Sequence, residues 1–165
     1  MVEVKVESVR VNLVGTHRVV VLKEVNSERY LPIWIGQAEA ESITLRLTNT
    51  KVPRPLTHDL IVDAIRALGA TVRYVLVNDL RDETFYARLV LRTRDGKELS
   101  IDSRPSDAIA IAVRVDCPIY VDDDVMAQHS HQPEEESSEE KQEEEDLGAF
   151  KDFLSTLDLD DLDKK

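Results

Sequence analysis

The chain has 165 residues, of which 42% are hydrophobic, and its 21 Lys and Arg residues against 33 Asp and Glu residues give a net charge of -12. This composition excludes a wholly disordered chain, and no apolar run approaches the ~18 residues of a membrane span. The N-terminus alternates charged and apolar residues, unlike a signal peptide, so we expect a cytoplasmic location without a membrane partner. The single Cys117 excludes an internal disulfide and a thiolate cluster.

The acidic charge is concentrated at the C-terminal end of the chain. Residues 122–165 hold 17 acidic and 4 basic side chains, so residues 1–121 carry a net charge of only +1. We therefore predict a folded domain over 1–121, a disordered acidic linker over 122–146 and a short amphipathic helix over 147–165. A nearly neutral domain neither excludes a nucleic-acid partner nor has the basic excess of a dedicated DNA-coating protein.

The first half of the domain predicts three strands. Residues 2–13 alternate like a strand, and their valines change parity near Glu7 and Ser8, which predicts a β-bulge or a sharp bend. Further runs of strand length follow at 18–25 and 30–35. Pro32 within the third run predicts an edge strand or an irregular one, because proline has no backbone N–H to give to a neighbour.

Two helices follow these strands. Apolar residues recur at helical spacing from Gly36 to about residue 49 and predict a first helix. A second helix is predicted over 58–68, with Thr57 as its N-cap and Gly69 as its C-terminal stop.

The second half repeats the strand pattern and ends with a third helix. Strands are predicted at 71–78, 83–92 and 97–102. The helix that follows has Pro105 in its first turn and an apolar body, so it should be buried. A last strand is predicted at 118–121.

The two halves align without a gap at an offset of 68 residues, with 8 identities in the 43 positions from 4 to 46. This predicts two strand-strand-strand-helix repeats. The fold class is therefore α+β, with a mixed or antiparallel sheet and about three helices. Glu39 and Asp107 fall at the same place in the repeat, in the first turn of a helix that follows a strand.

A resemblance to a known family rests on several blocks in order: LPIWIGQAEAESI, RPLTHDL, TFYARLVL and IDSRPSDAIAIAVR followed by PIYV. Together these resemble the bifunctional nuclease (DNase–RNase) domain family over about residues 1–122. The resemblance implies a compact α+β domain that self-associates, here as a homodimer, and that hydrolyses DNA and RNA.

Phosphodiester hydrolysis needs an activated water and groups that neutralise charge on the phosphate oxygens, commonly carboxylates with a divalent cation, assisted by His and Arg. Residues of these types lie near predicted helix starts, where phosphate binding is favoured. The catalytic candidates are Asp107, Glu39, His58 and Asp59. The candidates for substrate binding are Arg104 and Ser106, and those for holding Mg²⁺ or Mn²⁺ are Asp107 and Glu39.

A structural interpretation stays open at each of these positions. The acids could serve only the helix dipole, Ser106 could be a cap, and Arg104 could pair only with Asp107 or with a carboxylate of the other repeat. His58 could be an exposed first-turn residue. Trp34 is interpreted as a core side chain rather than as a platform for a stacked base.

A different class of function also remains open. The domain could be a non-catalytic, dimeric interaction or regulatory module whose acidic tail binds a protein partner through residues 147–165. A combined hypothesis has the acidic tail occupying the phosphate site of a nuclease as a brake.

Overall fold

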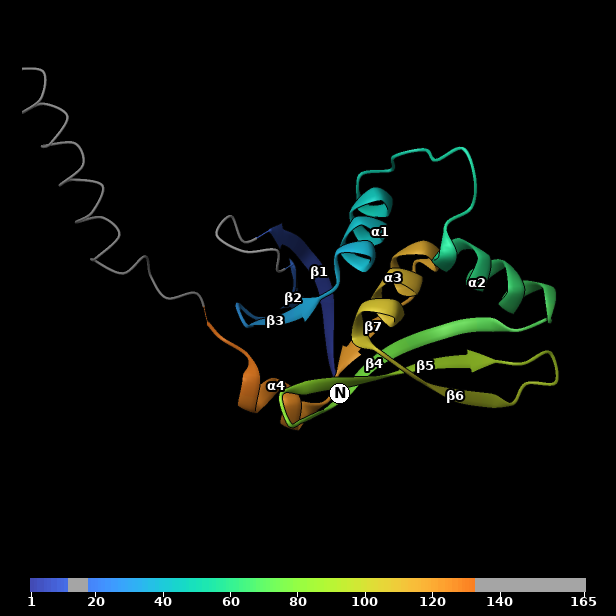
Figure 1. Cartoon of the computed structure of the whole chain (residues 1–165). Helices are drawn as coiled ribbons and strands as arrows, with labels where there is room; N and C mark the ends of the chain where they lie inside the picture. Colours follow the sequence, from blue (N-terminus) through green and yellow to red (C-terminus); the bar gives the residue numbers. More distant parts are fainter. Residues whose placement is uncertain (12–17, 133–165) are drawn as a thin grey trace, which may run out of the picture. The chain divides into compact units, whose positions relative to one another are not determined.

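The computed structural model describes residues 1–11 and 18–132 of the chain. It confirms the predicted α+β class, with a seven-stranded sheet and, within those ranges, four helices (Figure 1). In the same ranges no helix is long and apolar enough to cross a membrane. The elements in chain order are β1 (Val2–Val11), β2 (Arg18–Glu24), β3 (Tyr30–Ile35), α1 (Gln37–Leu47), α2 (Thr57–Ala67), β4 (Thr71–Arg81), β5 (Thr84–Arg92), β6 (Glu98–Ser103), α3 (Pro105–Val115), β7 (Ile119–Val121) and α4 (Asp123–His129).

The strands lie in the order β3-β2-β1-β7-β4-β5-β6. The short β7 pairs antiparallel with β1 and parallel with β4, whereas all other neighbouring strands are antiparallel. One repeat therefore lies on each side of β7. The predicted duplication is confirmed, since β6 and α3 follow β3 and α1 at an offset of 68 residues at both bounds.

Two irregularities predicted from the sequence occur in the sheet. The register of β1 against β2 shifts between Val6 and Ser8, which confirms the bulge at the change of parity. Pro32 lies in β3, which is an edge strand of the sheet. An edge strand tolerates proline because its outward backbone groups have no neighbour to pair with.

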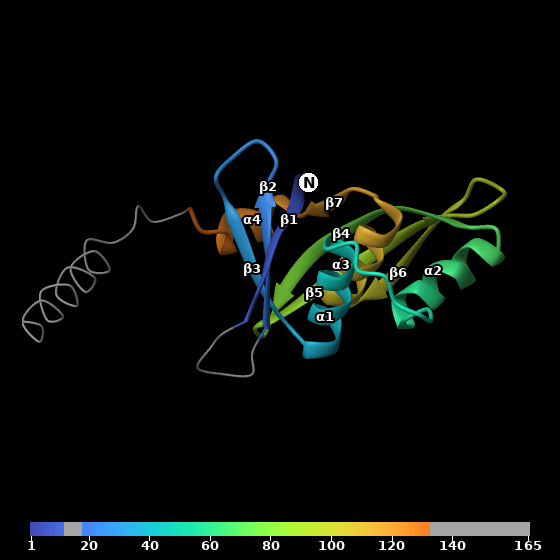
Figure 2. The same ribbon diagram turned by 90° about the horizontal axis from the view of Figure 1, so that it is seen from above.

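Helices α1, α2 and α3 lie over one face of the sheet, and α3 contacts both other helices (Figures 1 and 2). Most of α3 is buried, as its apolar body predicts. The most buried large side chains of the core come from the sheet and from three of the helices: Val20, Leu22, Leu31, Val75, Val77, Val121, Ile43, Ile109 and Met126.

Helix α4 lies where the sequence predicts the start of a disordered linker, so the interpretation of residues 123–129 as linker is wrong. Val125 and Met126 are buried, and α4 packs against β4. Asp122 caps the helix by accepting the backbone N–H of Asp124 at 3.0 Å. Two apolar side chains in a polar stretch are thus enough to anchor one short helix. The rest of the predicted linker from 133, and the helix predicted over 147–165, lie outside the described residues.

The start of α2 differs by one residue from the sequence prediction. Leu56 is the N-cap and Thr57 is the first helical residue. The cap interaction comes from Asp59, whose Oδ2 accepts the backbone N–H of Leu56 at 2.8 Å. The predicted C-terminal stop is confirmed, because Gly69 follows the helix with φ at +76°.

Candidate functional site

The two repeat-related acids meet on one arginine. Arg104, the N-cap of α3, donates from Nη2 to Oε1 of Glu39 at 2.6 Å and from Nε to Oδ2 of Asp107 at 2.7 Å. Its Nη2 also donates to Oδ1 of Asp107 at 3.1 Å. The packing of α1 against α3 therefore brings the two first-turn carboxylates to a shared cation. This juxtaposition follows from the repeat, since each acid occupies the third position of its helix.

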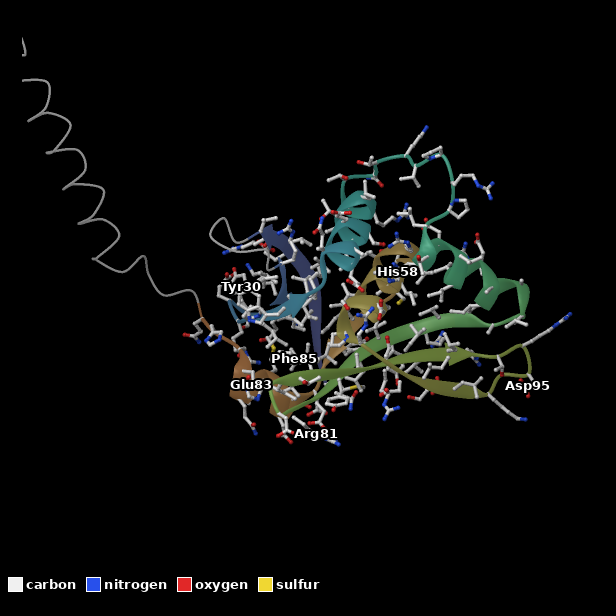
Figure 3. All side chains as sticks on the ribbon, viewed as in Figure 1. Tyr30, His58, Arg81, Glu83, Phe85 and Asp95 are labelled. Carbon is white, nitrogen blue, oxygen red and sulfur yellow. The ribbon has the colours of Figure 1, made fainter. Side chains whose placement is uncertain are left out.

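His58 extends this cluster toward α1. It lies in the first turn of α2 and is buried, which overturns the interpretation of an exposed first-turn residue. Its Nε2 lies 3.1 Å from Oδ1 of Asp107, and its Nδ1 lies 2.9 Å from Oγ of Ser42. Figure 3 shows His58 at the start of α2, beside α3.

The donor and acceptor roles in the series Arg114–Ser42–His58–Asp107 follow from Arg114, which can only donate. Nη2 of Arg114 donates to Oγ of Ser42 at 2.9 Å. The Ser42 hydroxyl can then give its own hydrogen to Nδ1 of His58, and the ring N–H at Nε2 is directed at the carboxylate of Asp107. Both ring nitrogens of His58 therefore have a side-chain partner that fixes the orientation of the ring. Sequence reasoning missed Ser42, whose only signal is a hydroxyl among the buried residues of α1.

Arg114 ties the three helices together behind this cluster. Its side chain is 6% exposed, and its Nε donates to Oδ1 of Asp59 at 2.7 Å. Its Nη1 donates to the carbonyl of Ala110, and its Nη2 donates to both the carbonyl and the hydroxyl of Ser42. Asp59 therefore belongs to the Arg114 side of the network and not to the group around Arg104. Arg114 was also missed as a site residue. Its signal in the sequence is its place at the end of the apolar helix α3, because a buried cation needs hydrogen-bond partners.

These contacts stabilise the charged forms of Asp107, Asp59 and Arg104. Burial raises the pKa of Asp107, but hydrogen bonds from Arg104 and His58 outweigh burial and leave that pKa below its usual value. At Asp59 burial is likewise outweighed, by the backbone N–H of Leu56 and by Arg114, so the pKa is again lowered. Hydrogen bonds to Asp107 and Glu39 raise the pKa of Arg104, which stays a cation.

These lowered pKa values predict a loss of stability in acid. Because Asp59 and Asp107 bind protons less readily in the folded chain than at the usual pKa of 3.8, their stabilisation is complete well above that value and disappears as the pH falls below it. Thermal midpoints between neutral pH and about pH 3 would measure the loss. Asp59→Asn should flatten the profile, whereas Asp63→Asn, in an exposed ion pair, should not. A profile that Asp59→Asn leaves unchanged would contradict this account.

The cluster around Arg104 faces a cavity of about 490 Å³ between α1, α2 and α3. Polar groups that line it include those of Glu39, Ser42, His58, Arg104 and Asp107. The side chain of Arg104 is 66% exposed, so its guanidinium is reachable from solvent. The predicted junction of the two helix starts is therefore also a concave surface of the size that small polar ligands occupy.

A second cavity, of about 340 Å³, lies on the other side of Arg104 and includes Ser106 and Trp34. Ser106 is buried and is not the N-cap of α3, a position that Arg104 holds. Trp34 is 64% exposed, so its interpretation as a core residue is wrong. It alternates along β3 with Ile33, which is 2% exposed, so the two side chains point to opposite faces of the strand.

The expected pair of metal ligands contacts a cation already. Both Glu39 and Asp107 bind Arg104, and the described residues contain no group of three or more His, Cys, Asp or Glu residues that could hold a metal ion. Two converging carboxylates fit a Mg²⁺ or Mn²⁺ ion that arrives with a substrate phosphate and keeps several waters. They do not fit an ion held by protein ligands alone.

Comparisons with known proteins match the part of the chain that carries this site. The bifunctional nuclease domain matches residues 20–134. An uncharacterized protein of Mycobacterium tuberculosis is 44% identical over 164 residues, which cover 98% of this chain and 98% of that protein.

Named relatives from plants match a shorter stretch. Bifunctional nuclease 1 of Oryza sativa subsp. indica is 33% identical, and Bifunctional nuclease 2 of Arabidopsis thaliana is 35% identical, each over 108 residues. Each match covers 64% of this chain and 33% of the plant protein. This chain therefore spans about a third of the length of these plant relatives.

Proposed function

The chain belongs to the bifunctional nuclease domain family, and on that premise we propose that it is a nuclease that hydrolyses phosphodiester bonds in DNA, RNA or both. One observation carries the proposal: Glu39 and Asp107 converge on an exposed Arg104 at a cavity that His58 also lines. Cation, carboxylates and imidazole at one concave surface are the groups that this reaction needs.

Arg104 binds the phosphate in this proposal. Its guanidinium is held by two carboxylates, which fix its orientation, and its exposed edge can donate to phosphate oxygens. It also neutralises part of the charge that gathers on those oxygens as the attacking water adds to phosphorus. Before substrate binds, the two carboxylates and the guanidinium together carry a net charge of -1.

His58 takes up the proton of the attacking water through Ser42. Water gives a proton to the Ser42 hydroxyl as that hydroxyl passes its own hydrogen to Nδ1 of His58, and the carboxylate of Asp107 stabilises the resulting imidazolium. The new P–O bond forms as the bond to the departing sugar oxygen breaks, and this oxygen takes a proton from solvent. Ser42 takes part in the proton transfer itself, because its hydroxyl contacts the attacking water on one side and His58 on the other.

A divalent cation remains a proposal for the same site. Glu39 and Asp107 would hold Mg²⁺ or Mn²⁺ once a phosphate has drawn Arg104 away from one of them. The ion would supply further positive charge next to the phosphate oxygens.

We expect EDTA to lower the cleavage rate at least about tenfold and added Mg²⁺ or Mn²⁺ to restore it. EDTA should leave the thermal midpoint of the substrate-free chain unchanged, because the described residues do not form a site for a resident ion. The measurement is cleavage of a labelled oligonucleotide beside differential scanning fluorimetry. Full activity in EDTA would contradict a metal requirement, and a lowered midpoint would show that an ion is held without substrate.

The direct test of the proposed function uses the purified full-length chain. Labelled single-stranded DNA, duplex DNA and RNA are incubated with fractions from two successive chromatographic steps. The proposal expects cleavage that follows the protein through both steps. Cleavage that separates from the protein, or none on any of the substrates, would contradict it.

A second candidate function, a dimeric interaction module, is favoured by the outer face of α2. Leu60, Ala64 and Leu68 lie one turn apart on this helix, and all three are exposed, with Leu68 at 85%. We propose that two copies of the chain associate through this stripe. Sedimentation equilibrium should give a dimer that the double change Leu60→Lys and Leu68→Lys converts to monomer. A monomeric wild-type chain would contradict the dimer.

Binding of a protein partner through residues 147–165 stays a prediction, since that segment lies outside the described residues.

A further inference from the structure

We propose that the cavity beside Trp34 binds one unpaired nucleobase of the substrate, next to the phosphate that Arg104 holds. This inference rests on the proposed function and names a binding subsite for it. Trp34 lies near the end of the edge strand β3, and 64% of its side chain is exposed. A large aromatic side chain that is mostly exposed on a concave surface can take part in stacking with a base.

The walls of this cavity come from three separate parts of the chain. They are the end of β3 with Gly36, the start of β5 with the residue before it, and the first turn of α3. Figure 3 labels Glu83 and Phe85 at the β5 wall. Phe85 and Trp34 thus line the same cavity.

Arg104 connects this cavity to the candidate site. Its side chain lines both the cavity of about 340 Å³ with Trp34 and the cavity of about 490 Å³ with His58 and Asp107. A nucleotide whose base lies against Trp34 would therefore have its phosphate next to the guanidinium. The same placement directs the scissile bond toward the carboxylate and imidazole on the far side of Arg104.

The chemistry of the lining favours a base over a second phosphate. Trp34 and Phe85 are aromatic residues of this lining, and the carboxylate of Glu83 would repel a phosphate. An uncharged, planar base suits these walls, whereas the negative charge of the nucleotide belongs at Arg104. The cavity, of about 340 Å³, is of a size for one base and its sugar. A base that enters it leaves its pairing partner outside, so the proposed subsite takes an unpaired nucleotide.

The single tryptophan of the chain makes binding directly observable. Emission of the full-length chain is recorded during titration with a short single-stranded DNA, with an abasic strand of the same length, and with inorganic phosphate. EDTA is present to prevent cleavage. We expect quenching by the strand that carries bases and little change with the other two, because only a stacked base alters the surroundings of the indole. Equal quenching by the abasic strand would overturn the subsite.

Affinity measurements with variants complete the test. By fluorescence anisotropy of a labelled strand, Trp34→Ala should weaken binding about tenfold, the effect of one lost stacking contact, and Trp34→Phe should recover most of it. Against the abasic strand Trp34→Ala should have no effect. Tyr86→Ala is the matched control, because Tyr86 is also an exposed aromatic residue of the sheet but does not line this cavity.

The outcomes separate this inference from the proposed function. If Trp34→Ala binds both strands like the wild-type chain while cleavage is intact, the subsite is wrong and the nuclease assignment stands. If binding depends on Trp34 and on bases but no strand is cut when Mg²⁺ or Mn²⁺ is present, the subsite stands and the nuclease assignment is wrong. A wild-type chain that binds no strand overturns both.

Discussion

Asp107→Asn is expected to lower the rate of phosphodiester cleavage about 10³-fold. The carboxylate accepts from Arg104 at two atoms and from Nε2 of His58, so its charge both orients the phosphate-binding guanidinium and stabilises the imidazolium. The amide of asparagine has the same shape as the carboxylate but carries no charge. Its NH₂ group would also face either Arg104 or His58, and both of these donate hydrogen bonds. Single-turnover cleavage of a labelled strand at saturating protein measures the chemical step without substrate affinity.

Asp102→Asn is the matched control for this change. Asp102 is an exposed aspartate of β6, and its carboxylate lies 3.6 Å from Nη1 of Arg88, so it also faces an arginine but lies outside the cavity. Its amide variant should cleave at the wild-type rate. Asp107→Asn should keep a folded chain, shown by an unaltered circular dichroism spectrum. Retention of wild-type cleavage by Asp107→Asn would remove this carboxylate from the mechanism.

Arg114→Met is expected to destabilise the chain by about 3 kcal/mol, which lowers the thermal midpoint by about 10 °C for a domain of this size. The change leaves Asp59 without its guanidinium partner and removes the donors to Ser42 and Ala110. The expected loss lies at the low end for a buried ion pair because a third of the Asp59 side chain is exposed and solvent can screen it. Chemical denaturation measures the free energy of unfolding directly.

The repeat supplies a control for this prediction as well. Arg46 occupies the position of α1 that corresponds to Arg114 in α3, but it is exposed and donates to the carbonyl of Val113 at 3.2 Å. Arg46→Met should change the free energy of unfolding by no more than about 0.5 kcal/mol. If both variants lost the same free energy of unfolding, burial of the Arg114 side chain would not be the reason for its contribution to stability.

The fold was predictable where local pattern and tertiary packing agree. The parity change at Glu7, the apolar body of α3 and the positive φ required at Gly69 each have a local physical cause. The meeting of Glu39 and Asp107 was predictable in outline from the 68-residue offset. The sequence also left open that Arg104 pairs with Asp107 or with a carboxylate of the other repeat. That it pairs with both at once was not predictable, since the distance between two helix starts depends on how α1 and α3 pack.

The missed features depend on contacts between segments far apart in the sequence. Helix α4 forms because Val125 and Met126 find a place in the core, although the segment around them is polar. Trp34 is exposed because Ile33, on the opposite face of β3, is the side chain that enters the core, and the packing of the whole sheet decides which face that is. Ser42 matters through His58 and Arg114, which lie 16 and 72 residues away along the chain. No local pattern can report such partners.

The central claim is that the two repeat-related acids act as one unit through Arg104, and a double-mutant cycle tests it most directly. Single-turnover cleavage is measured for Glu39→Gln, Asp107→Asn and the double variant. The account predicts that the double variant is hardly slower than Asp107→Asn alone, because the first change already releases the guanidinium they share. Losses that multiply in the double variant, or a Glu39→Gln variant with the full wild-type rate, would contradict it.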